Sequence, residues 1–206
     1  MQSCSSGHYS PNPNAAASTE CVAITAGFSF SVTGTAPSLV FAQAKCTAGK
    51  YCTQGSSAFL SCPAGFYCPE GSAAPIKCKA GKYCAGTDNV TPDGDCTAGY
   101  YCIEGASSAT PTDGTTGNIC PKGYYCPAGS NSPVACPIGT YRSSLQGTQA
   151  SDCQACDAGR YCDGVGLESP NILCFEGYFC DASSTSPNPR EHSCTPGHKC
   201  PVGSTA

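Results

Sequence analysis

The sequence CPAGFYC, at residues 62–68, is the unit from which most of this chain is built. A cysteine opens the unit, a glycine stands at its fourth position, an aromatic residue precedes the end, and a second cysteine closes it. A short internal period of this kind is typical of repeat proteins, in which small units contact only their neighbours. Seven further copies read CTAGKYC (46–52), CKAGKYC (78–84), CTAGYYC (96–102), CPKGYYC (120–126), CDAGRYC (156–162), CFEGYFC (174–180) and CTPGHKC (194–200).

Two variants of the unit place the second cysteine further along the chain. The variants CSSGHYS (4–10) and CPIGTYR (136–142) keep the glycine and the tyrosine, and their next cysteines are Cys21 and Cys153. With these variants included, all 20 cysteines can be paired. Sequence alone does not fix disulfide connectivity, so two registers have to be weighed.

Pairing within each unit leaves no cysteine over, and we favour it for that reason. A register shifted by one cysteine, beginning with Cys52–Cys62, strands Cys4 and Cys200 and requires them to pair between copies. The favoured pairs are Cys4–Cys21, Cys46–Cys52, Cys62–Cys68, Cys78–Cys84, Cys96–Cys102, Cys120–Cys126, Cys136–Cys153, Cys156–Cys162, Cys174–Cys180 and Cys194–Cys200.

The composition predicts stability from disulfides rather than from a hydrophobic core. Twenty cysteines in 206 residues is a density typical of secreted disulfide scaffolds. The chain also has 24 glycines, 17 prolines, one methionine and no tryptophan, which leaves little large apolar material for a core. In the chain-entropy treatment, a bridge closing a seven-residue loop contributes about 2–2.5 kcal/mol.

These features predict an elongated rod of small disulfide-rich repeats with essentially no α-helix. The glycine of each unit suits a turn with positive φ, and the aromatic residue and second cysteine suit an extended return. We therefore expect short, stapled β-hairpins. All 11 tyrosines stand in the aromatic positions of the units, where they either cover neighbouring disulfides or form an exposed binding row, and we favour the covering role.

Residues 22–45 form the longest stretch without cysteine and predict a longer β-hairpin. Apolar residues alternate with small or polar ones from Val22 to Val32, residues 34–38 include Pro37 and suit a turn, and residues 39–45 can return. An apolar strand face with an open edge is a pairing surface. We therefore expect contact with other copies, or with distant units, rather than simple packing on adjacent units. The contact residues are Val22, Ile24, Phe28, Phe30 and Val32.

The predicted organisation is a series of segments along the chain. They are a variant unit (1–21), the hairpin insertion (22–45), five short repeats (46–135), a wide-spaced unit (136–155) and three short repeats (156–206).

The wide-spaced unit resembles a known family. The sequence CPIGTYRSSLQGTQASDCQAC, at residues 136–156, is similar to the ephrin-receptor-like cysteine-rich repeats, relatives of the tumour-necrosis-factor-receptor modules. The CPxGYYCPxGS units, as at residues 120–130, look like the form found in secreted and surface proteins of protists and algae. The resemblance covers nearly the whole chain apart from residues 22–45, and it implies an elongated extracellular protein.

The sequence offers no catalytic, cofactor or metal site. Only Cys153 and Cys156 have a zinc-like spacing, and the acidic loop of Asp88, Asp93 and Asp95 lacks the ordered calcium-binding pattern. A cysteine nucleophile needs an unpaired thiol, and full pairing leaves none. We predict no enzyme, no cofactor and no metal.

Nucleic acids and membranes are not expected partners of this segment. The formal net charge is −4, no cluster of lysines and arginines is present to bind phosphates, and no stretch is long and apolar enough to span a membrane. The start lacks the pattern of a signal peptide, so we expect a segment of a longer secreted chain.

Glycans are an expected modification. Asn89-Val90-Thr91 is an acceptor sequence for N-linked glycan and lies in the long linker after Cys84. Serine and threonine near proline in other linkers are consistent with O-linked glycans.

The leading functional expectation is a structural segment of an extracellular filament or cell-surface stalk whose partners are copies of itself. The alternative is a receptor-like extracellular module that binds a protein ligand. One observation favours repetition beyond the chain: joining residues 201–206 to residues 1–3 leaves nine residues between Cys200 and Cys4, as between Cys52 and Cys62. We therefore expect either a tandem chain or a head-to-tail polymer.

Overall fold

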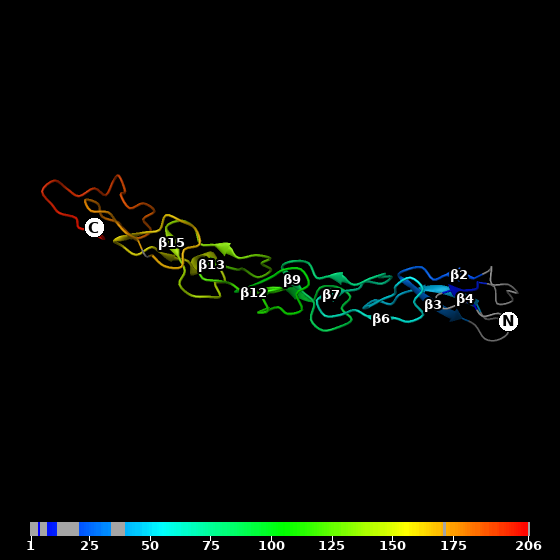
Figure 1. Cartoon of the computed structure of the whole chain (residues 1–206). Helices are drawn as coiled ribbons and strands as arrows, with labels where there is room; N and C mark the ends of the chain where they lie inside the picture. The colour runs from blue at the N-terminus through cyan, green and yellow to red at the C-terminus, as the bar shows by residue number, and fades with distance from the viewer. Residues whose placement is uncertain (1–3, 5–7, 12–20, 34–39, 171, 206) are drawn as a thin grey trace. The chain divides into compact units, whose positions relative to one another are not determined.

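The protein is a series of short strand pairs and disulfide-closed turns without α-helix in the described residues. The computed structural model describes residues 4, 8–11, 21–33, 40–170 and 172–205, without the side chains of residues 31–33 and 40–42. The chain divides into two compact regions, each containing several repeat units. The first region is Met1–Gly94 with Glu104–Ser108, and the second is Asp95–Ile103 with Ala109–Ala206. Within each compact region, Figure 1 shows the strand pairs following one another along the chain.

The described residues form nine two-stranded antiparallel sheets, each made of strands consecutive in sequence. The first compact region contains β1 (His8–Tyr9), β2 (Val22–Ala23), β3 (Phe28–Thr33), β4 (Val40–Lys45), β5 (Lys50–Tyr51), β6 (Leu60–Ser61), β7 (Phe66–Tyr67), β8 (Ile76–Lys77) and β9 (Lys82–Tyr83). Strand β10 (Gly94–Asp95) pairs with β9 and lies at the boundary between the two regions. The second compact region contains β11 (Tyr100–Cys102), β12 (Gly117–Ile119), β13 (Tyr124–Tyr125), β14 (Val134–Ala135), β15 (Thr140–Tyr141), the 3₁₀ turn η2 (Ala150–Asp152), β16 (Gln154–Ala155), β17 (Arg160–Tyr161) and β18 (Ile172–Leu173).

The ten disulfides have the within-unit register. Eight of them join cysteines six positions apart, and Cys4–Cys21 and Cys136–Cys153 join cysteines 17 positions apart. No cysteine is free.

The glycine of each unit makes the turn that brings the two cysteines together. In residues 46–52, the Lys50 N–H donates to the carbonyl of Thr47, and Gly49, at the third turn position, has φ +84°. A type II turn requires positive φ at that position, which glycine adopts without steric cost. The turn and the disulfide together form a closed loop of seven residues.

The strand pairs join one unit to the next, which differs from the expectation of a hairpin inside each unit. Strand β5 pairs with β6, so Tyr51 lies opposite Leu60 across the linker that leads to Cys62. Strands β7 and β8 repeat the arrangement with Tyr67 opposite Ile76. A loop of seven residues closed by a turn leaves no room for a second strand, so the aromatic segment finds its partner beyond the second cysteine.

The cysteine-free segment contains a turn where the alternating pattern predicts continuous strand. Strand β2 ends at Ala23, Gly27 has φ +85°, and the paired strands β3 and β4 begin at Phe28 opposite Lys45. The expected return strand is present, but the hairpin starts six residues later than Val22. The predicted turn at residues 34–38 lies outside the described residues.

Half-cystines make up most of the buried core. Among the buried hydrophobic residues in the described part of the chain, those other than cysteine are Ile24, Ala106 and Tyr161. Tyr161 packs with Cys174 and Cys180, the disulfide of the following unit, which fits the covering role expected of the tyrosines. The other described tyrosines are half-buried.

Candidate functional site

The contact between successive repeats is a regular pair of backbone hydrogen bonds centred on the unit glycine. The Gly49 N–H donates to the carbonyl of Cys68 in the next unit, at 2.8 Å, and the Cys62 N–H donates back to the carbonyl of Gly49, at 3.2 Å. We call this reciprocal pair the glycine ladder. It recurs, with N···O distances of 2.8–3.2 Å, at Gly27, Gly65, Gly99, Gly123, Gly139, Gly159 and Gly177.

A further hydrogen bond connects a unit to the turn that follows the next unit. The Cys52 N–H donates to the carbonyl of Ser72, and the Cys162 N–H donates to the carbonyl of Ser184. The receiving residues lie in the turn that follows the second cysteine of the later unit. The second cysteine of the earlier unit therefore lies against the turn that ends the next unit.

The ladder brings backbones so close that a side chain on the glycine would collide with the covering turn. A Cβ built on Gly27 would lie 2.4 Å from the carbonyl oxygen of Gly71, and one on Gly65 would lie 2.4 Å from that of Gly105. Carbon and oxygen atoms do not approach so closely without displacement. At positions such as Gly27 and Gly65, glycine is therefore required by contact as well as by its φ angle.

One repeat in this ladder was missed by the sequence pattern because it has no cysteine. Residues 24–30, ITAGFSF, align with residues 46–52, CTAGKYC, and Ile24 takes the place of the first cysteine. The Gly27 N–H donates to Cys52, and the Gly55 N–H donates to the carbonyl of Ile24, as Gly71 does to Cys46. Ile24 is 2% exposed. The shared Thr-Ala-Gly sequence is the signal that could have revealed this repeat.

The structure places the five predicted contact residues differently from one another. Val22 and Phe30 are exposed, Phe28 is half-buried, and Ile24 is buried inside its own chain, which leaves little of it for a partner to touch. The ring of Phe30 lies 6.5 Å from that of Tyr9. The side chain of Val32 lies outside the described part. A contact role for Val22, Phe28 and Phe30 stays a prediction.

The expected glycan acceptor lies in the described linker between Cys84 and Cys96. Asn89 is half-buried, its Nδ2 donates to the carbonyl of Ala85 at 2.9 Å, and its own carbonyl accepts the Cys68 N–H. The amide nitrogen carries two hydrogens and uses one of them here. Glycosylation at Asn89 stays a prediction.

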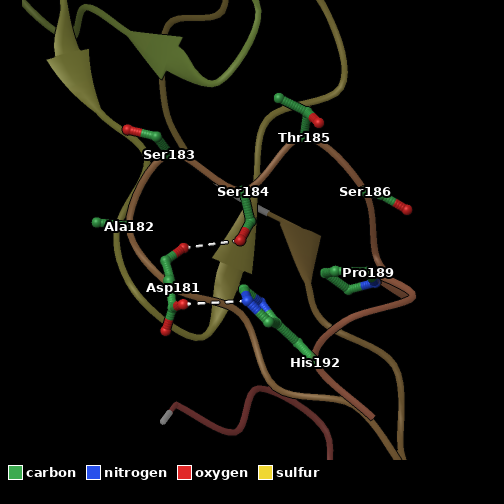
Figure 2. A pocket seen from close by; sticks show the side chains of 8 residues that line it. All are labelled: Asp181, Ala182, Ser183, Ser184, Thr185, Ser186, Pro189 and His192. Atoms are coloured by element: carbon green, nitrogen blue, oxygen red, sulfur yellow. Dashed lines mark hydrogen bonds and ion pairs between the residues drawn. The ribbon is translucent and has the colours of Figure 1, made fainter.

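A pocket of about 360 Å³ lies beside the loop from Asp181 to His192, and Figure 2 shows its lining. Asp181 Oδ2 lies 3.3 Å from His192 Nε2, and the His192 ring stacks on Phe179 with centroids 4.7 Å apart. The Ser184 hydroxyl donates to the backbone carbonyl of Asp181 rather than to the histidine. The arrangement fixes the loop and contains no serine–histidine pair for nucleophilic chemistry.

Three carboxylates have lowered pKa values because they accept hydrogen bonds. The hydrogen bond from Lys50 lowers the pKa of Asp88. Hydrogen bonds from the side chain and backbone of Thr116, and then from Thr115, lower the pKa of Asp113 strongly. The Thr148 backbone N–H is the main cause of the lowered pKa of Asp152. Asp88 and Asp113 hold linker loops in shape, and Asp152 does the same inside the loop closed by Cys136–Cys153.

Within the described residues, no group of three or more His, Cys, Asp or Glu side chains is placed to hold a metal ion. The same residues contain no helix long and apolar enough to cross a membrane. No known protein family matches the chain, and no curated protein matches it in sequence.

Proposed function

We propose that this chain is a structural segment of an extracellular filament or cell-surface stalk, built from tandem or head-to-tail cysteine-rich repeats. The glycine ladder carries the proposal. Eight glycines from Gly27 to Gly177 use the same backbone groups to bind the following repeat, so the contact recurs along the chain and can be extended by adding units. Such an architecture supplies length and resistance to unfolding.

The ten disulfides support an oxidising, secreted setting. Within that setting, the sequence of residues 136–156, whose first and second cysteines form the Cys136–Cys153 disulfide, supports a relationship to the ephrin-receptor-like repeats. This resemblance favours an extracellular protein without specifying a ligand. Glycan on Asn89 would add to the solubility of the assembly.

Electron microscopy of the native material tests the proposal. We expect identical copies at a fixed spacing along a line or helix. A population of single chains, each binding one protein ligand, would contradict the filament and favour the receptor-like alternative. Mass spectrometry of the peptide that contains Asn89, before and after enzymatic removal of N-glycans, tests the modification.

A further inference from the structure

The Cys136–Cys153 bridge is more accessible than the bridges on either side of it. The seven bridges that join cysteines six positions apart between residues 46 and 180 are 0% exposed at both cysteines. Cys136 is also 0% exposed, but Cys153 is half-buried. Because a thiolate must reach a sulfur atom to attack it, Cys153 is the residue of this bridge at which thiol–disulfide exchange can begin.

Arg142 takes the position of the second cysteine in this wide-spaced unit. It stands six residues after Cys136, and its carbonyl accepts the Gly123 N–H at 2.9 Å. In the short repeat 62–68, the second cysteine makes this contact itself, because its carbonyl accepts the Gly49 N–H. The glycine ladder at this point therefore uses an arginine instead of the second cysteine of the bridge.

The Arg142 side chain holds the loop that carries Cys153. This side chain is 12% exposed, and its guanidinium donates to the carbonyls of Asp152, at 3.0 Å, and Leu145, at 3.1 Å. The Asp152 carboxylate lies 3.9 Å from the guanidinium and accepts the Thr148 N–H at 2.7 Å. Hydrogen bonds to an ionised group are about twice as strong as those between neutral groups. These contacts connect the two ends of the loop independently of the bridge.

We infer that the Cys136–Cys153 bridge is a site of thiol–disulfide exchange, where the chain accepts a thiol on Cys153 while its repeats stay folded. A thiolate forms a bond to Cys153 Sγ, and the bond between the two cysteines breaks. The electron pair of that bond leaves on Cys136 Sγ, which takes a proton from water. The incoming thiol is oxidised and Cys136 is reduced, so the step needs no other reagent. This inference goes beyond the proposed structural role and does not depend on it.

Reaction of the whole disulfide-bonded chain with reduced glutathione tests the site. After alkylation under denaturing conditions, mass spectrometry should find glutathione on Cys153 and an alkylated thiol at Cys136. This product should form about tenfold faster than any product of the Cys62–Cys68 bridge, whose two cysteines are 0% exposed. Equal rates at the two bridges, or glutathione on Cys136, would overturn the proposal.

A second probe identifies the kind of thiol that the site accepts. Small thiols and protein cysteines share this chemistry, so the reaction is repeated with ubiquitin that carries one introduced surface cysteine. Reaction of Cys153 with both probes supports attachment to another protein, and reaction with glutathione alone supports a small thiol. Failure of both probes to react with Cys153 contradicts the site.

Hydrogen exchange on the glutathione-modified chain tests whether the repeats stay folded. The Gly123 N–H donates to the carbonyl of Arg142, and the Arg142 N–H donates to that of Leu167, both at 2.9 Å. Both amides should keep their exchange rates within about twofold when the bridge opens. Loss of protection at either amide would mean that the bridge holds the repeats together, and would refute the inference.

Two double variants compare this bridge with a buried one. Serine at both cysteines of the accessible bridge should leave the Gly123 amide protected. Cys62→Ser with Cys68→Ser removes a bridge whose second cysteine takes part in the ladder, so exchange of the Gly49 amide should rise by about tenfold or more. Equal losses of protection in the two double variants would show that the accessible bridge is as necessary to the fold as the buried one, against the proposal.

Arg142 acts here as a positioning residue, and a pair of arginine variants tests that role. Once glutathione has opened the bridge, Arg142→Gln should speed exchange of the Thr148 amide by about tenfold relative to the wild-type chain. Arg160→Gln is the control, because Arg160 also donates to a linker carbonyl, that of Pro170, but lies in a repeat with a buried bridge. Similar Thr148 exchange in the two variants would show that Arg142 does not hold the loop, and would overturn this part of the proposal.

Discussion

The glycine at the fourth position of a repeat meets two requirements, a positive φ angle and the absence of a side chain. Its positive φ is needed for the turn between the cysteines, and its missing side chain lets the covering turn approach. Gly86 also has positive φ, at +68°, but a Cβ on it would meet nothing within 4 Å. The chain therefore contains a glycine that shares the first requirement without the second.

Replacing Gly65 by alanine should be more damaging than replacing Gly86. Both variants carry the cost of a non-glycine residue at positive φ, about 1–2 kcal/mol. Gly65→Ala adds a collision with the carbonyl of Gly105 and should cost about 1–3 kcal/mol more. The local opening free energy from hydrogen exchange at residues 62–84 measures the difference. Equal losses in the two variants would mean that contact between repeats tolerates a methyl group.

Asp113 should make its linker sensitive to acid. The hydrogen bonds from Thr116 and Thr115 lower its pKa in the folded protein below the ordinary value of 3.8. The ionised carboxylate therefore stabilises the folded loop above about pH 4, and this contribution is lost as the pH falls through the lowered folded pKa. Chemical shifts of the Thr115 and Thr116 amides should change at a pH well below 3.8. Asp113→Asn should abolish that transition, and a transition near 3.8 in the wild-type protein would contradict the argument.

Among the strands, the prediction for residues 22–45 was partly wrong because it relied on the alternation of apolar residues. Alternation of apolar residues predicted one strand from Val22, but Thr25-Ala26-Gly27 forms a repeat turn that interrupts it. Period-two hydrophobicity does not distinguish a strand from a turn whose ends are both extended. Cysteine order, in contrast, predicted the disulfide register, because the shifted register leaves two cysteines unpaired within the chain.

The glycine ladder could not be predicted from the sequence in the same way. The repeated glycine indicated a turn, and that turn is present, but backbone hydrogen bonds between units leave no mark on side-chain chemistry. Burial likewise depends on stacking: Cys194 is half-buried and Gly197 is exposed, although residues 194–200 keep the cysteine and glycine spacing of the buried units.

Ile24 should behave as a core residue in place of a cysteine. It is 2% exposed, so Ile24→Ala should destabilise the repeat 24–30 by about 2–5 kcal/mol through loss of packing and creation of a cavity. Val22→Ala, at a position that is 44% exposed, should change stability by no more than about 0.5 kcal/mol. The rate of limited proteolysis within residues 21–46 measures the loss of stability in each variant. Comparable cleavage rates for the two variants would show that Ile24 does not anchor this repeat.

The β3–β4 hairpin supports a prediction about contact between copies. Burial of Phe28 and Phe30 at an interface would contribute roughly 3–6 kcal/mol, so replacing both with serine should dissociate the assembly and leave all ten disulfides formed. Phe59→Ser is the control, because Phe59 is exposed and lies in an interior linker. Light scattering measures the dissociation, and mass measurement without reduction shows whether all ten disulfides remain formed. An assembly that persists in the double variant would assign the hairpin to packing within its own chain.

The stability of the protein as a whole depends on its disulfide bonds. The buried hydrophobic residues that the structure describes are almost entirely half-cystines, so in this part of the chain the disulfides take the place of an ordinary hydrophobic core. Each seven-residue loop contributes about 2–2.5 kcal/mol by restricting the unfolded chain, so complete reduction should unfold the protein.

Partial reduction should proceed in an order set by burial. The bridge Cys194–Cys200 is half-buried, whereas bridges such as Cys62–Cys68 are 0% exposed, and a reductant must reach a sulfur atom to attack it. Brief treatment with reductant followed by alkylation should therefore label Cys194 and Cys200 before Cys62 and Cys68. Simultaneous reduction of both bridges in the dilute chain would mean that the repeats open together, and that burial by neighbouring repeats does not protect their disulfides.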